Sequence, residues 1–167
     1  MLPLVLNPHF IKVGLVGKGE ALARRAALLA EAGVEARLLS ADASDAVLAP
    51  LQLLCVAGLG EGDARHLAGR ARALGLLVNV EDVLPLCDFH VPAMVRRGEL
   101  LLTASTGGEV PGLARRLREW LAVTFGPEWT ERLHDLSASR ARWRSVGLTK
   151  ADVSQKVRDL IDEKGWL

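Results

Sequence analysis

Asp82 is the residue of this sequence best placed to move a proton. It ends the segment Val78-Asn79-Val80-Glu81-Asp82, directly after the apolar run 76–80 that is predicted to form a strand. A carboxylate that follows a parallel strand lies at the carboxyl edge of the sheet, where ligands of such folds bind. There it can act as a general acid or base, or contact a metal ion. An aspartate at such a position is also a common turn or cap residue.

A glycine turn near the N-terminus, Gly17-Lys18-Gly19-Glu20, is a candidate phosphate site. It lies between the apolar predicted strand 11–16 and an amphipathic helix predicted over residues 20–32. Glycines in this context let a pyrophosphate approach the backbone amides and the positive end of the helix. The third small position of the dinucleotide fingerprint holds Leu22 instead. A plain strand-to-helix turn is the alternative interpretation.

Asp42 is a candidate for binding the ribose of a dinucleotide. Such a site needs an acid near the end of the second strand, and Asp42 follows the predicted strand 34–39 through Ser40 at about the right offset. A helix cap or a solvated loop carboxylate fits the same position equally well. These interpretations remain open at the level of sequence.

Ser105-Thr106-Gly107-Gly108 is a second turn that can bind anions, because hydroxyls, glycine backbone and helix-end amides combine there. The helix that follows carries Arg115, Arg116 and Arg118. Arginine binds carboxylates with two parallel hydrogen bonds. An exposed basic helix face is the alternative. We expect this turn, Asp82 and the first glycine turn to meet at one edge of one sheet.

Composition describes a folded protein of ordinary size. The chain has 167 residues, half of them apolar and a quarter charged, with a net charge of +1 that gives no global attraction to nucleic acid. Cys55 and Cys87 form no C-x-x-C motif, and no His or Cys pair has metal-ligand spacing, so we expect no bound metal. We find no signal segment and no apolar run long enough to span a membrane. We therefore expect a cytoplasmic protein.

Alternation of strands and helices up to residue 80 predicts an α/β fold, a Rossmann-like, doubly wound and mostly parallel sheet. The runs 90–95 and 99–105 follow without a helix between them, as a hairpin or as the last strands of that sheet. Helical periodicity then continues to the C-terminus. We predict a dinucleotide-binding domain over 1–110 and a helical region over 111–167, whose apolar stripes fit a homodimer interface.

From residue 2 to about residue 121, the chain resembles the precorrin-2 dehydrogenase / sirohydrochlorin ferrochelatase family, the stand-alone form of the N-terminal module of siroheme synthase. The resemblance rests on the following matching pieces: Leu2-Pro3-Leu4, Val16-Gly17-x-Gly19-Glu20, Arg24-Arg25, Leu28-Leu29-x-x-x-Gly33, Val78-Asn79-Val80-x-Asp82, Leu86-Cys87-Asp88-Phe89, Pro92-Ala93, Ser105-Thr106-Gly107-Gly108 and Pro111-x-Leu113-Ala114-Arg115-x-Leu117-Arg118-Glu119.

The resemblance implies NAD-dependent oxidation of precorrin-2 to sirohydrochlorin, followed in some members by insertion of Fe²⁺ to give siroheme. It also implies a homodimer with its active site between the nucleotide domain and the helical part. The family's key aspartate falls on Asp82, which we predict to be catalytic. Predicted cofactor contacts are Gly17, Lys18, Gly19, Glu20, Ser40, Asp42, Ala57, Gly58 and Val80. Predicted substrate contacts, for the tetrapyrrole carboxylates, are Ser105, Thr106, Gly107, Gly108, Arg115 and Arg118.

The chain departs from the family pattern around the cofactor. Lys18 stands where members usually carry Gly, and Leu22 where they carry Ala. The segment 57–61, Ala-Gly-Leu-Gly-Glu, replaces Ala-Thr-Asp-Asp followed by Asn. Two alternatives therefore remain beside the dehydrogenase: a non-catalytic dinucleotide- or tetrapyrrole-binding module, and a chelatase without dehydrogenase activity.

Overall fold

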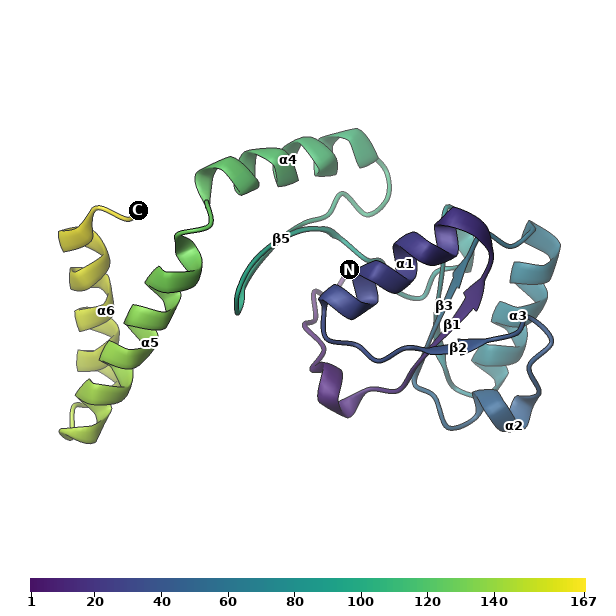
Figure 1. Cartoon of the computed structure of the whole chain (residues 1–167), viewed down its shortest axis with the longest axis horizontal. Coiled ribbons are helices and arrows are strands. Elements are labelled where there is room, and N and C mark those ends of the chain that lie inside the picture. The colour runs from purple at the N-terminus through teal and green to yellow at the C-terminus, as the bar shows by residue number, and fades with distance from the viewer. The chain divides into compact units, whose positions relative to one another are not determined.

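The computed structural model describes residues 1–167, which form two compact units, Met1–Val91 and Pro92–Leu167. The first unit is an α/β layer structure (Figure 1). Its strands are β1 (Val13–Gly17), β2 (Arg37–Leu39), β3 (Leu53–Ala57) and β4 (Leu77–Val80), and its helices are α1 (Gly19–Glu31), α2 (Asp45–Leu48) and α3 (Glu61–Ala73). Short 3₁₀ turns, Pro8–Phe10 and Leu84–Leu86, precede β1 and follow β4.

The four strands are all parallel and lie in the order β2-β1-β3-β4. Side chains alternate between the two faces of the sheet, and both faces are covered. Leu15 and Cys55 pack toward α1 with Leu29, whereas Val56 packs toward α3 with Leu67. This two-sided burial makes the strands nearly continuous apolar runs, as parallel sheets require. The predicted doubly wound, Rossmann-like α/β fold is confirmed.

The sheet ends at β2, where a complete Rossmann sheet continues with another strand. The usual strand order is 3-2-1-4, but here the third strand of the chain pairs on the other side of β1. Nothing in the sheet therefore pairs with the outer edge of β2. Leu38 of this strand points to the face that carries α1 and is 66% exposed. The sheet is a shortened version of the predicted architecture.

The second unit begins with an antiparallel hairpin, β5 (Ala93–Arg97) and β6 (Leu100–Ala104), which forms a sheet of its own. Helices α4 (Pro111–Thr124), α5 (Trp129–Ser145) and α6 (Lys150–Lys164) follow. Arg97 joins the hairpin to the end of α4, because its guanidinium donates to Phe125 O at 2.9 Å and to Ala122 O at 3.1 Å.

This hairpin corrects two expectations. The chain divides after Val91 and not near residue 110, because β5 and β6 pair only with each other and contact α4. Consequently, the turn that starts at Ser105 does not follow a strand of the parallel sheet. The expectation that it shares one sheet edge with Asp82 and the Gly17 turn was wrong.

Local contacts cap α6 and join the C-terminus to α5. Thr149 and Asp152 form a capping box at the start of α6, and Gly165 ends that helix in the left-handed conformation. The guanidinium of Arg132 lies 5.2 Å from the ring centroid of Trp129 and 5.3 Å from that of Trp166, which ties the C-terminus to α5. No helix in the protein has the length and apolar character needed to cross a bilayer.

Candidate active site

The loops after β1 and β3 pack backbone against backbone. A Cβ atom on Gly17 would lie 1.9 Å from the carbonyl oxygen of Ala57, and the amide of Lys18 donates to that same oxygen at 3.1 Å. Gly58 has φ +72°, and a Cβ there would lie 2.4 Å from the carbonyl oxygen of Lys18. The structure thus brings four predicted cofactor residues, Gly17, Lys18, Ala57 and Gly58, into one close contact.

The N-terminus of α1 is open beside this contact. Lys18 precedes the helix in extended conformation, and no side chain caps the first turn. Gly19 has φ +64°, and no atom lies within 4 Å of the place where its Cβ would be. The first amides of a 13-residue helix therefore have no side-chain acceptor. This is the arrangement that receives a pyrophosphate, so these residues fit a dinucleotide.

Ser40 and Asp42 lie in the loop after β2. The Ser40 hydroxyl donates to the Asp42 carboxylate, and the amide of Ala43 donates to Ser40 O at 3.1 Å. The N-cap of α2 is Ser44, so Asp42 does not cap that helix. Asp42 is instead an exposed loop carboxylate at the carboxyl end of a strand. That position suits a ribose hydroxyl, and the helix-cap interpretation is excluded.

Glu20 and Val80 are placed differently from the other predicted cofactor residues. The Glu20 side chain is 96% exposed and lies 3.7 Å from Arg24. Arg24 in turn lies 3.9 Å from Glu81, which connects α1 to the turn after β4. The Val80 side chain is buried in the core under α3.

Asp82 lies in that turn and is the one residue other than glycine with a positive φ, +62°. The amide of Glu81 still bonds to Val56 O at 2.9 Å, so the sheet ladder ends one residue before Asp82. The Asp82 side chain is exposed. Because the ends of β1, β3 and β4 are neighbours in the sheet, Asp82, Gly58 and Lys18 lie at the same carboxyl edge.

Cys87 closes the turn, a role that sequence reasoning missed. Its thiol donates to Val80 O at 3.1 Å and accepts from Val80 N at 3.3 Å. Asn79 adds a bond from its amide to Phe89 O at 2.9 Å. These contacts bind the chain beyond Asp82 to the free edge of β4. The segment Cys87-Asp88-Phe89 was part of the family pattern, but its spacing alone does not reveal this pairing.

The predicted substrate residues belong to the second unit. Gly107 and Gly108 have φ +69° and +86°, so the turn depends on both glycines. The hydroxyl oxygens accept local bonds at 3.3 Å, Ser105 from Gly107 N and Thr106 from Val110 N. The hydroxyl protons and the amides of Gly108 and Gly112 are not used in these contacts.

The arginines that follow this turn lie on the exposed surface of α4. Arg115 and Arg118 are both exposed, and Arg115 lies 3.4 Å from Glu119. The loosely paired Arg115 and the Arg118 side chain are therefore free to meet an anionic ligand.

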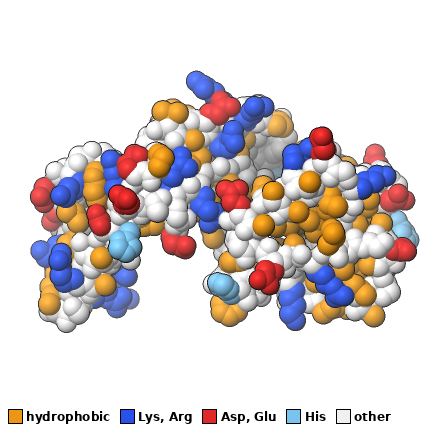
Figure 2. Space-filling model, in the orientation of Figure 1, with side chains coloured by type: hydrophobic (Ala, Val, Ile, Leu, Met, Phe, Trp, Pro, Cys, Tyr) orange, Lys and Arg blue, Asp and Glu red, His pale blue; other side chains and the backbone are white.

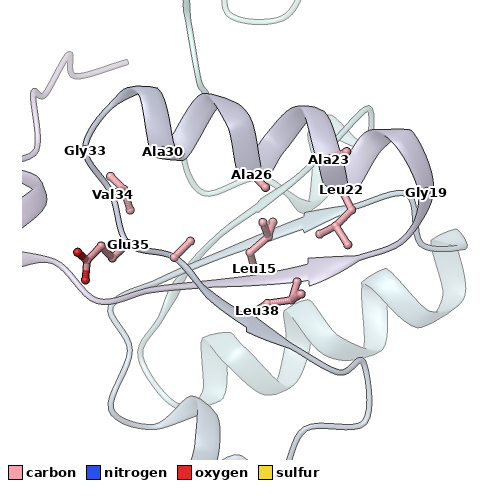
Figure 3. Close-up of a pocket in the computed structure, with 11 residues that line it drawn as sticks. Leu15, Gly19, Leu22, Ala23, Ala26, Ala30, Gly33, Val34, Glu35 and Leu38 are labelled. Carbon is pink, nitrogen blue, oxygen red and sulfur yellow. The ribbon is translucent and has the colours of Figure 1, made fainter.

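An apolar groove between α1 and β2 begins at Gly19, beside the open end of α1, and leads away from it. It runs from Gly19 to Gly33 and is lined by Leu22, Ala26 and Leu38 among others (Figure 3). Figure 2 shows hydrophobic side chains gathered on the face of the first unit that carries these elements. The groove lies on the face of the sheet that carries α1, over the edge strand β2. Its apolar lining does not suit a pyrophosphate.

Comparison with known proteins also indicates a nucleotide-binding domain in the first unit. A family model described as putative NAD(P)-binding matches residues 4–93. The siroheme synthase of Stutzerimonas stutzeri is 34% identical over 153 residues, covering 75% of this chain and 32% of the relative. The siroheme synthase of Methylococcus capsulatus is 28% identical over 183 residues, covering 97% of this chain and 35% of the relative. The chain thus spans about a third of the length of these relatives.

A solved structure shares the fold of the whole chain. It is titled SirC, precorrin-2 dehydrogenase, and it matches with a TM-score of 0.79 at 19% identity, covering 99% of this chain and 92% of that one. The alignment to the Methylococcus protein is 183 positions long, more than the 167 residues of this chain. That relative therefore carries residues within the matched region that have no counterpart here.

Proposed function

This chain belongs to the family of siroheme synthases and precorrin-2 dehydrogenases, through a putative NAD(P)-binding domain, and from that premise we propose that it oxidises precorrin-2 to sirohydrochlorin with NAD⁺. One observation carries the proposal. The open N-terminus of α1 and the left-handed Asp82 turn lie at the same carboxyl edge of the first unit's sheet. A dinucleotide and a proton-transfer group are the two things that a dehydrogenation of this kind needs.

The cofactor residues have distinct roles in this proposal. Gly19 and the following amides of α1 bind the pyrophosphate, and Asp42 with Ser40 binds a ribose. Gly17 and Gly58 keep the two loops close enough to leave the helix end open. NAD⁺, when bound, supplies the hydride acceptor. We propose NAD⁺ rather than NADP⁺ because Asp42 would repel a 2′-phosphate.

Asp82 is the proposed base. Dehydrogenation removes a hydride and a proton from the macrocycle, and the Asp82 carboxylate takes the proton. If the chain also inserts Fe²⁺ as a substrate metal, pyrrole protons must leave as well, and the same carboxylate can accept them. The precorrin-2 acetate and propionate groups are the proposed ligands of the Ser105–Gly108 turn, Arg115 and Arg118.

A homodimer is part of the proposal. Helix α4 has no buried residue, and its exposed apolar side chains include Leu113, Leu117, Trp120 and Val123. Burying such a row of side chains against a second copy removes apolar surface from water. Sedimentation of wild type and Trp120→Glu tests this, with a dimer expected for the first and a monomer for the second.

The deciding experiment is anaerobic incubation with precorrin-2, first with NAD⁺ or NADP⁺ and then with Fe²⁺ or Co²⁺. We expect NAD⁺-dependent appearance of the sirohydrochlorin spectrum, and metal insertion is followed separately. Failure to oxidise precorrin-2, by protein that is folded and binds NAD⁺, would contradict the dehydrogenase.

A chelatase without dehydrogenase activity is the second candidate. It is favoured by the loop after β3, where Gly58 and Leu59 offer no polar side chain beside the cofactor end of the sheet. NAD⁺ at 100 times its Kd should stabilise the dehydrogenase by about 2.7 kcal/mol in thermal unfolding. Metal insertion with no NAD⁺-dependent stabilisation at millimolar concentration would favour this candidate.

A further inference from the structure

The chain that follows the Asp82 turn is fixed to β4 by one aspartate. The amide of Asp88 donates to Val78 O at 2.7 Å, and the Asp88 carboxylate accepts from Val78 N at 2.9 Å. Asp88 thus satisfies both backbone groups of Val78 on the free edge of the sheet. A single residue does here what a neighbouring strand would do.

Arg72 of α3 holds this aspartate from the other side. Its Nε lies 2.9 Å and 3.0 Å from the two carboxylate oxygens of Asp88, and its terminal nitrogen donates to Leu86 O at 2.9 Å. The guanidinium therefore fixes the chain at two points, Leu86 and Asp88. We name these contacts the Arg72–Asp88 clasp.

The clasp fixes one end of a short segment whose other end is fixed by the sheet. Val80 is the last residue of β4, and the segment from Glu81 to Leu86 carries Asp82 between the two fixed ends. Asp82 has φ +62°, a conformation that costs most residues about 1–2 kcal/mol and that aspartate adopts more readily than most. Such conformations persist where the surroundings determine them strongly.

We infer that Arg72 and Asp88 are positioning residues for Asp82. They hold the turn in the conformation that places the Asp82 carboxylate at the sheet edge. Asp88 is occupied by Val78 and Arg72 and so does not replace Asp82 as a base. The inference rests on the proposed role of Asp82, but the order of the turn can be measured without any assumption about the reaction.

The same helix provides a matched control. Arg70 donates to the Asp45 carboxylate at 3.0 Å and 2.6 Å and to Ala43 O at 2.6 Å. Arg70 thus repeats the pattern of Arg72, one arginine bound to one aspartate and one carbonyl. It joins α2 to α3 at the end of the loop that carries Ser40 and Asp42, and it does not touch the Asp82 turn. Any general cost of losing an Arg–Asp contact on α3 should appear equally in the two places.

The test compares Asp88→Asn with Asp45→Asn in the full chain. We expect Asp88→Asn to lower kcat for precorrin-2 oxidation by up to about 100-fold, because small displacements of a reacting group have effects of that size. NAD⁺ affinity should stay within about twofold, since the clasp does not touch the β1 and β3 loops. Asp45→Asn should leave kcat at saturating NAD⁺ unchanged, and any effect should fall on NAD⁺ affinity, because the loop that this contact holds carries Ser40 and Asp42.

Amide hydrogen exchange supplies the readout that is independent of activity. We expect faster exchange over residues 81–86 in Asp88→Asn and unchanged exchange there in Asp45→Asn. Arg72→Lys keeps the charge but cannot reach two partners with a planar fork, so it should show the same effect in weaker form. It also serves as the test if Asp88→Asn does not fold.

Equal losses of kcat in the Asp88 and Asp45 variants, or unchanged exchange over residues 81–86, would overturn the inference. If wild type does not oxidise precorrin-2, the proposed function fails, and the exchange experiment alone decides whether the clasp orders the turn.

Discussion

The two halves of the candidate site are built by opposite means. The loops after β1 and β3 meet backbone to backbone, and Gly17 and Gly58 are required because any side chain would strike a carbonyl oxygen. The turn after β4 is instead held by side chains, since Cys87 and Asp88 bond to the edge of β4. The cofactor half should therefore fail when an atom is added. The catalytic half should fail when a polar group is removed.

The largest effect should come from removing the Asp82 carboxylate. We expect Asp82→Asn to lower precorrin-2 oxidation by about 10²- to 10⁴-fold, the range for loss of a general base. Asparagine tolerates a positive φ, so the turn should survive and NAD⁺ affinity should be unchanged. Steady-state kinetics and NAD⁺ titration measure the two quantities. Near-normal turnover would show that another group takes the proton.

The second prediction adds one atom to the cofactor half. Gly58→Ala places a Cβ 2.4 Å from Lys18 O at a φ of +72°, so the two loops must separate. We expect a loss of about 1–3 kcal/mol in unfolding free energy and at least a tenfold weaker binding of NAD⁺. Gly60→Ala is the matched control, because Gly60 has φ −64° and no atom within 4 Å of its Cβ position. Equal behaviour of the two variants would contradict the steric argument.

More of the cofactor half than of the catalytic half could be predicted from the sequence. The strand, the glycine turn and the helix are local features, so Gly17 and Gly19 could be placed from periodicity and spacing alone. Gly58 looked like a loss of the family's polar residues. The structure gives a steric reason for it, because this loop packs on Lys18. Whether a glycine is needed depends on which backbone lies opposite, and the sequence does not contain that information.

The catalytic half was recognised by its motif and not by its contacts. Arg72 and Asp88 are 16 residues apart and belong to different elements, so no local pattern pairs them. The hairpin is a second case in which local sequence patterns do not determine which segments pair. The runs 90–95 and 99–105 were predicted as a hairpin or as the last strands of the parallel sheet, and the sequence did not decide between the two. Strand pairing is a tertiary property, and the expectation of one shared sheet edge failed for this reason.

The third prediction removes a smaller polar group from the catalytic half. Cys87→Ala leaves both Val80 N and Val80 O without the thiol, at a cost of about 1 kcal/mol in unfolding free energy. We expect a few-fold lower kcat with unchanged NAD⁺ affinity. Cys87→Ser keeps a donor and an acceptor and should restore most of the turnover. If alanine and serine behave alike, the hydrogen bonds of the thiol do not hold the turn.

The smallest predicted effect is a pH-dependent change in unfolding free energy that comes from Cys55, the buried thiol of the cofactor half. Burial in β3 raises the pKa of Cys55 above its ordinary value of 9.0, and the nearby positive charge of Arg25 only partly opposes this. The unfolded chain therefore loses the thiol proton at a lower pH than the folded chain. The stability that this thiol contributes is complete below pH 9.0 and is lost as the pH rises through the folded pKa.

Chemical unfolding of wild type and Cys55→Val across this range measures the contribution. The unfolding free energy of wild type should fall relative to that of Cys55→Val above pH 9.0, and the two should run parallel below it. A thiol reagent at neutral pH should modify the partly exposed Cys87 before the buried Cys55. Faster modification of Cys55 would mean that β3 opens more readily than the Asp82 turn, the reverse of the order that close backbone packing requires.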